Sequence, residues 1–342
     1  MNLRIVRPAL ALAVLASTFV PVLAHAQYKV LNTYKVGGDG GWDYVTADSA
    51  ARRLYIARSG AQGSVFVYNL DTFAQVGTID GVSGHGAIVD DSNHHGFVTS
   101  KPVTMFDSES LKVIKTIDTG GNPDGFLLDS DAHRVYILSH ASPNVIVLDT
   151  NDGSILGKID LGGAPEQSQL DGKGHLYIDL EDKDAIAVVD TASLKVIGKY
   201  DISSKGGGCA GLGMDKANGI LFASCRDKHN MIIVNAADGK ILDVLPEGVG
   251  SDGVAFNPST MEAFSTQGDG TLTIVKENSP TSFVVEQTVT TPQRARTLTL
   301  DTKTGHIITA TADFGPAPAA QPGQRVRPPM LPGTFRIVVI GK

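Results

Sequence analysis

Short apolar segments recur along the chain at a nearly constant spacing. Each unit contains an apolar strand, an Asp-rich turn, a second strand ending in small residues, a third strand of the form V-x-V-x-D and a fourth of the form K-V-x-x-x-I. The turn residue recurs every 39 to 44 residues, at Asp48, Asp90, Asp129, Asp171, Asp215, Asn257 and Asp301. Seven four-stranded units of about 42 residues are typical of propeller blades. The pattern therefore predicts an all-β fold, a seven-bladed β-propeller.

The third strands follow the same register and indicate how the ring closes. They lie at 65–68, 103–106, 145–148, 185–189, 231–234, 272–275 and 335–339. The seventh unit ends after its third strand, whereas residues 28–36, near the other end of the chain, have the fourth-strand pattern. We expect this N-terminal strand to complete the last blade, which would remove two sheet edges open to pairing with other chains. An open solenoid is the structural alternative, but it would not need the displaced strand.

The composition agrees with a fold of strands and tight turns. Of the 342 residues, 38 are Gly, 42% are hydrophobic and 6% are aromatic. A chain of this length often forms two domains, but propellers reach this size as one. Residues 27–342 are therefore predicted to form a single domain. The formal net charge of −7 argues against nucleic acid as a partner, because such binding depends on Lys and Arg neutralising phosphates.

The N-terminal segment 1–26 has the features of a secretory signal peptide. Arg4 and Arg7 form a positive region, residues 9–17 are apolar, and Ala24-His25-Ala26 is an A-x-A cleavage site. The apolar run is too short to span a bilayer. An N-terminal core helix is the alternative. We expect a mature chain that starts near Gln27, without a membrane anchor, in the periplasm of a bacterium or secreted from it.

The two cysteines of the chain are predicted to form a disulfide. Cys209 and Cys225 flank the turn sequence at 215–219. In a hairpin centred on Ala217 they would be direct cross-strand neighbours, within the reach of a disulfide. An exported protein is also in a compartment where disulfides persist. Two buried free thiols are the alternative.

The repeated unit resembles that of a known protein family. Residues 122–136, followed by 145–150, look like the YVTN repeat, and the mature chain, about 28–342, resembles the exported YncE-like seven-bladed propellers. The Pro-rich segment 313–334 and the closing residues 335–342 are also similar to that group. The resemblance implies the propeller fold. It implies no agreed enzymatic role, and DNA binding is attributed to the family's namesake.

Candidate functional residues lie where each inner strand begins. In a propeller, the loops that enter the inner strands and those that join the second and third strands share one face, the top face, at the mouth of the central channel. Five residues before each turn marker stand Asp43, His85, Asp124, Glu166, Ala210, Asp252 and Arg296, with Trp42 and Cys209 one residue earlier. Converging carboxylates raise one another's pKa unless a cation compensates them. Arg296 can offset one carboxylate, and a divalent ion can offset more.

Oxygen ligands with one imidazole suit Ca²⁺ or a borderline transition metal. The predicted metal ligands are Asp43, His85, Asp124, Glu166 and Asp252. Trp42, His140 and Arg296 complete the predicted ligand-binding set on the top face. The alternative is a solvated acidic funnel that contains ordered water.

The histidines divide between the two faces. His85, His140 and His229 are expected on the top face, where His85 and His140 come from neighbouring blades and could act as general bases or metal ligands with Asp124 and Glu166. Turn residues of the opposite face are His94, His95, His133, His175 and His306. Lys101, Glu181 and Arg226, in loops between second and third strands, are expected to form the outer rim of the top face.

Two further patterns bear on function. The segment 313–334, between the second and third strands of the last blade, is rich in Pro, Gly and Ala around Arg325 and Arg327. It is either a mobile loop or a lid or partner tether. The segments 206–211 and 248–253 match G-x-G-x-x-G, but neither precedes a helix in a βαβ unit, which argues against dinucleotide binding.

The sequence favours a monomeric binding or scaffold protein that takes a protein partner or a small ligand on the top face. One alternative is a propeller lactonase or lyase that uses His85 and the channel carboxylates with a divalent cation. The other is a periplasmic metal- or redox-associated accessory protein. No catalytic residue is assigned, and a divalent cation is the one cofactor that the residues suggest.

Overall fold

The structure, a computed structural model, describes Met1 and residues 26–60, 63–318 and 328–342. Nearly all of the predicted signal peptide and residues 319–327 of the Pro-rich segment, with Arg325 and Arg327, lie outside the described residues. In the described part of the chain every regular element is a β-strand. That part contains no helix with the length and apolar character needed to cross a membrane.

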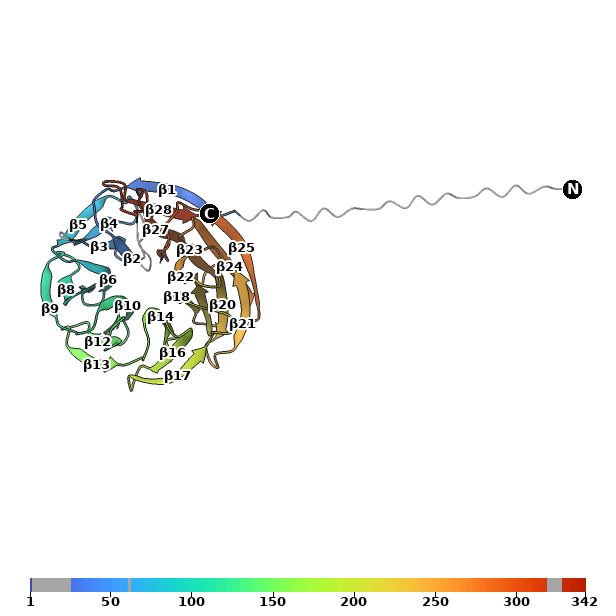
Figure 1. The fold of residues 1–342 in the computed structure, drawn as a ribbon, viewed down its shortest axis with the longest axis horizontal. Helices are drawn as coiled ribbons and strands as arrows, with labels where there is room; N and C mark the ends of the chain where they lie inside the picture. The colour runs from blue at the N-terminus through green and yellow to red at the C-terminus, as the bar shows by residue number, and fades with distance from the viewer. Residues whose placement is uncertain (2–25, 61–62, 319–327) are drawn as a thin grey trace.

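Seven antiparallel four-stranded sheets are arranged in a ring (Figure 1). In six of the blades the strands follow one another in sequence, from the innermost strand at the centre of the ring to the outermost at its rim. The predicted seven-bladed β-propeller is confirmed.

The strands of the first three blades are regular in length. Blade one has β2 (Trp42–Asp48), β3 (Arg53–Arg58), β4 (Ser64–Asn69) and β5 (Gln75–Asp80). Blade two has β6 (Gly84–Asp90), β7 (His95–Ser100), β8 (Val103–Asp107) and β9 (Val113–Ile117). Blade three has β10 (Pro123–Asp129), β11 (Arg134–Ser139), β12 (Val145–Asp149) and β13 (Ile155–Ile159).

The next three blades repeat this order. Blade four has β14 (Pro165–Leu170), β15 (His175–Leu180), β16 (Ala185–Asp190) and β17 (Lys195–Asp201). Blade five has β18 (Cys209–Asp215), β19 (Ile220–Cys225), β20 (Asn230–Asn235) and β21 (Ile241–Pro246). Blade six has β22 (Ser251–Asn257), β23 (Glu262–Gln267), β24 (Thr271–Ser279) and β25 (Ser282–Thr290).

Blade seven joins the two ends of the chain. Its strands are β26 (Leu298–Asp301), β27 (His306–Thr311) and β28 (Arg336–Gly341), with the N-terminal β1 (Lys29–Lys35) as the outermost. β1 runs antiparallel to β28, and Lys29 pairs with Gly341 and Lys35 with Arg336. The predicted closure of the ring by the N-terminal strand is therefore confirmed.

Residues next to β1 and β28 also bind one carboxylate of the neighbouring blade. Glu262, at the start of β23, is 1% exposed. Tyr28 Oη donates a hydrogen bond to Glu262 Oε2, and Lys342 Nζ lies 2.9 Å from Glu262 Oε1. Burial alone would raise the pKa of Glu262, but the hydrogen bonds from Tyr28 and Lys342 bring it below its usual range. The closing strand thus binds blade six as well as blade seven.

The core lies between the blades. Apolar residues of the second and third strands are buried almost throughout, and clusters form where adjacent blades meet. Between blades three and four, Tyr136 and Val147 pack with Leu176 and Val189, all fully buried. The outermost strands β9 and β13 expose most of their side chains. Since apolar packing holds the blades together, the polar ends of the inner strands are available for another role.

A buried pair of carboxyl groups connects blades five and six at the end of the inner strands opposite the top face. Asp215, at the end of β18, is 1% exposed and Glu277, in β24, is 2% exposed. Asn218 donates to Glu277 Oε1 at 2.7 Å, while Asp215 Oδ2 and Glu277 Oε2 are buried without hydrogen-bond partners. Burial, reinforced by Asp215, raises the pKa of Glu277 to about 7. This contact is therefore most stable when Glu277 is protonated.

Deletion of residues 28–36 tests the closure. Without β1, the edge of β28 is open and Glu262 loses its Tyr28 partner, so we expect a lower thermal unfolding midpoint and association between molecules, because unpaired edges template pairing. Size-exclusion chromatography and thermal melting measure both effects. A truncated protein that stays monomeric with an unchanged melting curve would contradict a stabilising role for the strand.

The carboxyl pair predicts a stability that falls with pH. A group whose pKa rises from about 4.5 unfolded to about 7 folded binds its proton more tightly in the folded state. The contribution of this proton to the free energy of unfolding is at most on the order of 3 kcal/mol. It is fully present below pH 4.5 and is lost as the pH approaches 7. Glu277→Gln should therefore gain stability over the wild type at pH 8 but not at pH 4.5, as measured by urea unfolding.

Glu109→Gln provides the control for this prediction, because Glu109 is an exposed acid, 73% exposed at its side chain. It should leave the difference between the two pH values unchanged. If Glu277→Gln has the same pH dependence as the wild type, burial does not raise the pKa of Glu277 in the folded state.

Candidate functional site

The inner strands of the first six blades each contain a register irregularity at the predicted entrance position. In blade one the pairing passes from Trp42 with Arg58 to Val45 with Ile56, so that Asp43 falls outside the ladder. The same happens at His85, Asp124, Glu166, Ala210 and Asp252. Bulges re-aim side chains and are common beside functional sites. The irregularity therefore recurs at the same position in each blade. It frees the side chains at these positions from the regular alternation between the two faces of a strand.

Two histidines and three carboxylates meet at the top of blades one to four. His85 Nδ1 lies 3.0 Å from Asp43 Oδ2 and 3.0 Å from Asp124 Oδ1. His140 Nε2, from the loop after β11, lies 3.1 Å from Asp124 Oδ2 and 3.5 Å from Glu166 Oε1. Asp124 thus stands between the two imidazoles and offers a different oxygen to each. We call these five side chains the His–carboxylate cluster.

Arginines take the place of the histidines on the other side of the ring. Arg226, which follows β19, forms ion pairs with Glu181 of blade four and Asp252 of blade six. Arg296 Nε lies 3.0 Å from the other oxygen of Asp252. The sequence placed Glu181 and Arg226 on the outer rim, but Arg226 reaches inward to an entrance residue. Blade five, whose entrance residue Ala210 is the one of the six without a polar side chain, thus contributes a charged group through Arg226.

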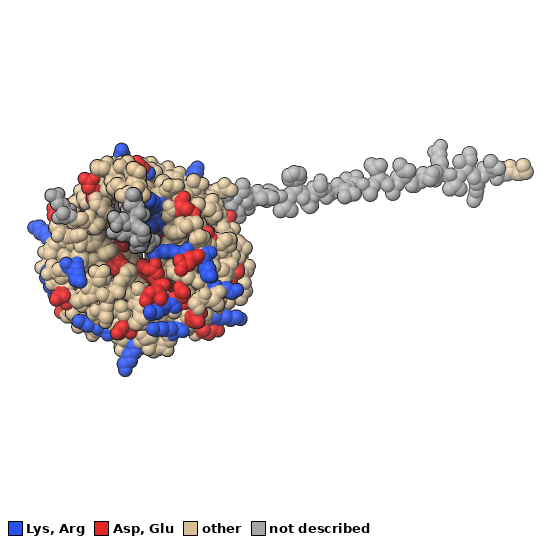
Figure 2. All heavy atoms as spheres, in the orientation of Figure 1, with Lys and Arg blue, Asp and Glu red and all other residues tan. Residues whose placement is uncertain are grey.

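Acids and bases therefore alternate around the top of the ring. On the face shown in Figure 2, acidic side chains gather about the centre, with basic side chains beside them. Contacts with Asp124 and Asp43 raise the pKa of His85 to about 10. Contacts with Glu166 and then Asp124 raise the pKa of His140 to about 9. From the sequence, we expected Arg296 or a metal ion to compensate the negative charge of the carboxylates. In the structure, two imidazolium groups and two guanidinium groups share this role.

The chain of alternating charges has one contact between like groups. Glu166, with a side chain 12% exposed, lies beside Glu181. Burial, with a smaller contribution from Glu181, raises the pKa of Glu166 to about 7 against the opposing effects of His140 and Arg226. Glu166 is thus the acid of the cluster that holds a proton near neutral pH.

Tyr44 lies beneath the cluster and was not predicted from the sequence. Its ring packs against Phe126 with centroids 5.3 Å apart. A Cβ at Gly86 would lie 2.8 Å from Tyr44 Cβ, and one at Gly125 would lie 3.1 Å from Tyr44 Oη. Burial raises the pKa of the phenol well above its usual value, with further contributions led by Asp124 and Glu166. The two glycines therefore leave the space through which this ring crosses from blade one to blade three.

Trp42, Lys101 and His229 are not part of the His–carboxylate cluster. Trp42 packs against Phe335 with centroids 4.8 Å apart, in the cluster between blades one and seven. Lys101 Nζ donates to the Gly121 carbonyl at 2.7 Å, and His229 is exposed. Turn contacts hold histidines of the opposite face: His175 Nδ1 lies 2.8 Å from Asp171, and His95 Nδ1 lies 2.8 Å from the Thr150 carbonyl.

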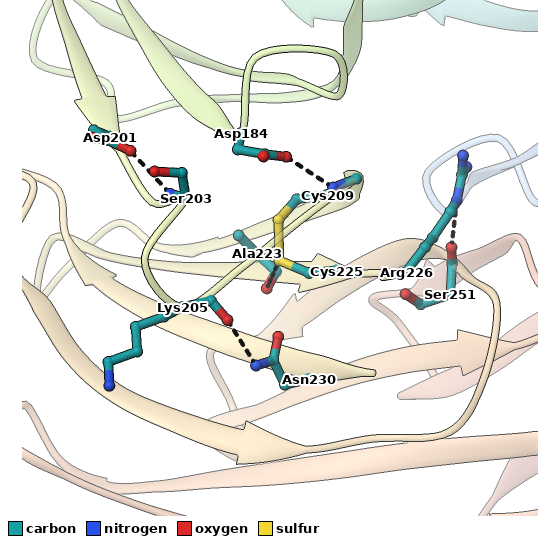
Figure 3. The surroundings of a disulfide bond; sticks show 11 residues. Asp184, Asp201, Ser203, Lys205, Cys209, Ala223, Cys225, Arg226, Asn230 and Ser251 are labelled. Carbon is teal, nitrogen blue, oxygen red and sulfur yellow. Dashed lines mark hydrogen bonds between the residues drawn. A yellow bond between two sulfur atoms is a disulfide. The ribbon is translucent and has the colours of Figure 1, made fainter. Parts of the chain in front are cut away.

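The predicted disulfide between Cys209 and Cys225 is present, but the hairpin register differs from the expected one. The strand pairs from Asp215 with Ile220 to Gly211 with Ser224 centre the hairpin between Ala217 and Asn218. The register irregularity at Ala210 then brings the two cysteines opposite each other. Figure 3 shows that Arg226 follows Cys225 and points toward Ser251, whose carbonyl accepts from Arg226 Nε at 2.9 Å. The disulfide thus anchors the strand end that carries Arg226.

The described ends of the Pro-rich segment 313–334 are held to blade seven. Phe314 and Met330 form an isolated β-bridge. The Arg294 guanidinium lies over the Phe314 ring at 4.4 Å, and Arg336 forms an ion pair with Asp313 at 2.8 Å. The lid or tether hypothesis concerns the part between these ends and stays a prediction.

The fold and its centre define the class: a seven-bladed β-propeller with a His–carboxylate cluster at the top of its inner strands. No protein-family model matches the chain. Over 166 residues it is 24% identical to uncharacterized protein YncE of Salmonella typhi and to that of Salmonella typhimurium, strain LT2. This segment covers 46% of the chain and 47% of each relative, so the chain matches about half the length of these curated relatives. The sequence similarity and the fold together support a YncE-like propeller, as the repeat predicts.

The fold is also shared with solved structures of low sequence identity. A chain from the crystal structure of the mitotic checkpoint complex superposes with a TM-score of 0.69 and 13% identity. The superposition covers 97% of this chain and 99% of that one. At this identity the likeness concerns the fold alone.

Removal of the disulfide should cost stability. The bridge joins residues 16 apart in sequence, and in the chain-entropy model a loop of this size contributes roughly 3 kcal/mol. We expect Cys209→Ser with Cys225→Ser to lower the free energy of unfolding by about that amount in urea titrations. Labelling of two thiols in denatured, unreduced wild-type protein would show that the bridge does not form.

Proposed function

We propose that this chain is an exported binding protein that holds a divalent transition-metal cation on the top face of the propeller. The observation that carries the proposal is the convergence of His85, Asp43 and Asp124. Their ligand atoms come from three different blades and lie within 4.8 Å of one another. Export is supported by the predicted signal peptide and is compatible with the disulfide.

The distances in this trio suit a small cation. A tetrahedral ion with ligand bonds of about 2.0 to 2.1 Å needs ligand atoms about 3.3 Å apart. His85 Nδ1 lies 3.0 Å from one oxygen of Asp43 and from one of Asp124, so small side-chain shifts would suffice. Since the bulges fix these positions in the backbone, little ordering remains to be done on binding.

Asp124 gives the second reason for a ligand at this place. It is 6% exposed, and its Oδ1 is buried without a hydrogen-bond partner of acceptable geometry. The nearby His85 nitrogen donates instead to Asp43. The ion-pair contact with His85 at 3.0 Å compensates the charge of this oxygen, and a metal ion would supply the direct bond that it lacks.

The ligand types favour a transition metal over Ca²⁺. Ca²⁺ takes six to eight oxygen ligands, whereas imidazole suits Zn²⁺, Cu²⁺ and related ions. The metal has to displace the proton on His85 Nδ1, so binding and protonation compete at that nitrogen. A lactonase or lyase would use the same ion to polarise its substrate, and turnover of a lactone panel by the metal-loaded protein distinguishes that alternative.

Calorimetric titration with Zn²⁺, Mn²⁺, Cu²⁺ and Ca²⁺ tests the proposal. We expect specific binding of transition metals and at most weak Ca²⁺ binding. Asp124→Asn with His85→Ala should weaken transition-metal binding by more than about 100-fold, since it removes two ligands and loss of an outer-shell partner alone costs 10 to 100-fold.

The matched control is His94→Ala with His95→Ala, which removes two imidazoles from the opposite face. It should leave the affinity unchanged. Binding that is lost in the control and kept in the top-face variant would place the ion on the opposite face. If none of the four ions binds, the proposed function is refuted.

A further inference from the structure

We propose that the top face holds two divalent cations, with the Asp124 carboxylate as a bridge between them. This inference rests on the proposed function and assigns a second ion to the same cluster. The first ion would take His85, Asp43 and Asp124 Oδ1. The second would take His140, Glu166 and Asp124 Oδ2.

The second trio has the same geometry as the first. His140 Nε2 lies 3.1 Å from Asp124 Oδ2 and 3.5 Å from Glu166 Oε1. These distances lie on either side of the separation of about 3.3 Å expected between ligands of a tetrahedral ion. The three ligand atoms lie within 4.8 Å of one another. The cluster thus contains two sets of one nitrogen and two oxygens, and only Asp124 belongs to both.

The orientation of Asp124 is that of a bridging ligand. Its Oδ1 faces the imidazole of blade two, and its Oδ2 faces the imidazole carried by the loop of blade three. Among the described residues, the nitrogens within ion-pair distance of these oxygens belong to the two histidines. Carboxylate bridges are typical of two-metal sites, whose ions lie about 3.5 to 4 Å apart. A carboxylate held by backbone N–H groups could not be shared in this way.

The surroundings of the second trio also favour a cation. Glu181 lies beside Glu166, so that two carboxyl groups are in contact, with His140 on the Glu166 side and Arg226 paired to Glu181. A divalent ion between His140 and Glu166 would relieve this contact. Glu181 would then stand next to the ion as a partner of Arg226, which is the kind of outer contact that orients metal ligands.

The stoichiometry of Zn²⁺ and the electron paramagnetic resonance of Mn²⁺ test the bridge. We expect two Zn²⁺ per chain by calorimetry and elemental analysis after dialysis. Two Mn²⁺ ions joined by a carboxylate should show magnetic coupling and lose the signal of isolated ions. His140→Ala should reduce the stoichiometry from two to one and abolish the coupling, and His85→Ala should do the same.

The matched control is His229→Ala, which removes an exposed imidazole of the same face and should leave two coupled ions. Circular dichroism and thermal melting show whether each variant folds, and the wild-type stoichiometry and coupling test the proposal independently of any variant.

The outcomes separate the two proposals. A single ion in the wild type, removed by His85→Ala and kept by His140→Ala, overturns the bridge and leaves the proposed function intact. Two ions without coupling overturn the bridge as well. If neither Zn²⁺ nor Mn²⁺ binds, both proposals fail.

Discussion

The pairing of β1 with β28 is the constraint on which the rest of this molecule depends. Each blade buries its faces against its neighbours, and two apolar clusters join blade seven to blade one and to blade six. The closing strand contributes to this directly, because Tyr28 packs edge-to-face on Phe264 at 5.4 Å and binds Glu262 of blade six. Closure joins blade seven to blade one, and so brings Arg296 and Asp43, at the starts of their inner strands, into one ring.

Closure creates an electrostatic problem that the side chains solve by alternation. Seven strand ends brought to one axis place Asp43, Asp124, Glu166 and Asp252 close together, and like charges at short range are unfavourable. Histidines stand between the acids on one side and arginines on the other. The two sides therefore differ in chemistry. An arginine keeps its charge, whereas a histidine can exchange its proton for a metal ion.

The repeat was sufficient to predict the blades, the closing strand and the entrance positions, because each of these recurs at a fixed offset from a turn residue. What it could not predict depends on irregularities and on side-chain length. The pairing register of the blade five hairpin was predicted one residue off, since the irregularity at Ala210 has no sequence signature of its own. Arg226 was placed at the rim because its position in the loop does not reveal how far its side chain extends. Tyr44 had one available signal, the glycines at 86 and 125 that make room for it.

The position of the closing strand determines when it can pair during synthesis of the chain. Tyr28 and its partner Gln287 are separated by 259 residues, and β28 is the last strand to be made. Contacts of such separation are slow to form, because a long segment must be ordered before they provide any gain. The N-terminal strand therefore waits, without its partner, until β28 has been made. Its lysines at 29 and 35 keep this waiting strand polar, which is a common protection of edges that would otherwise pair with another molecule.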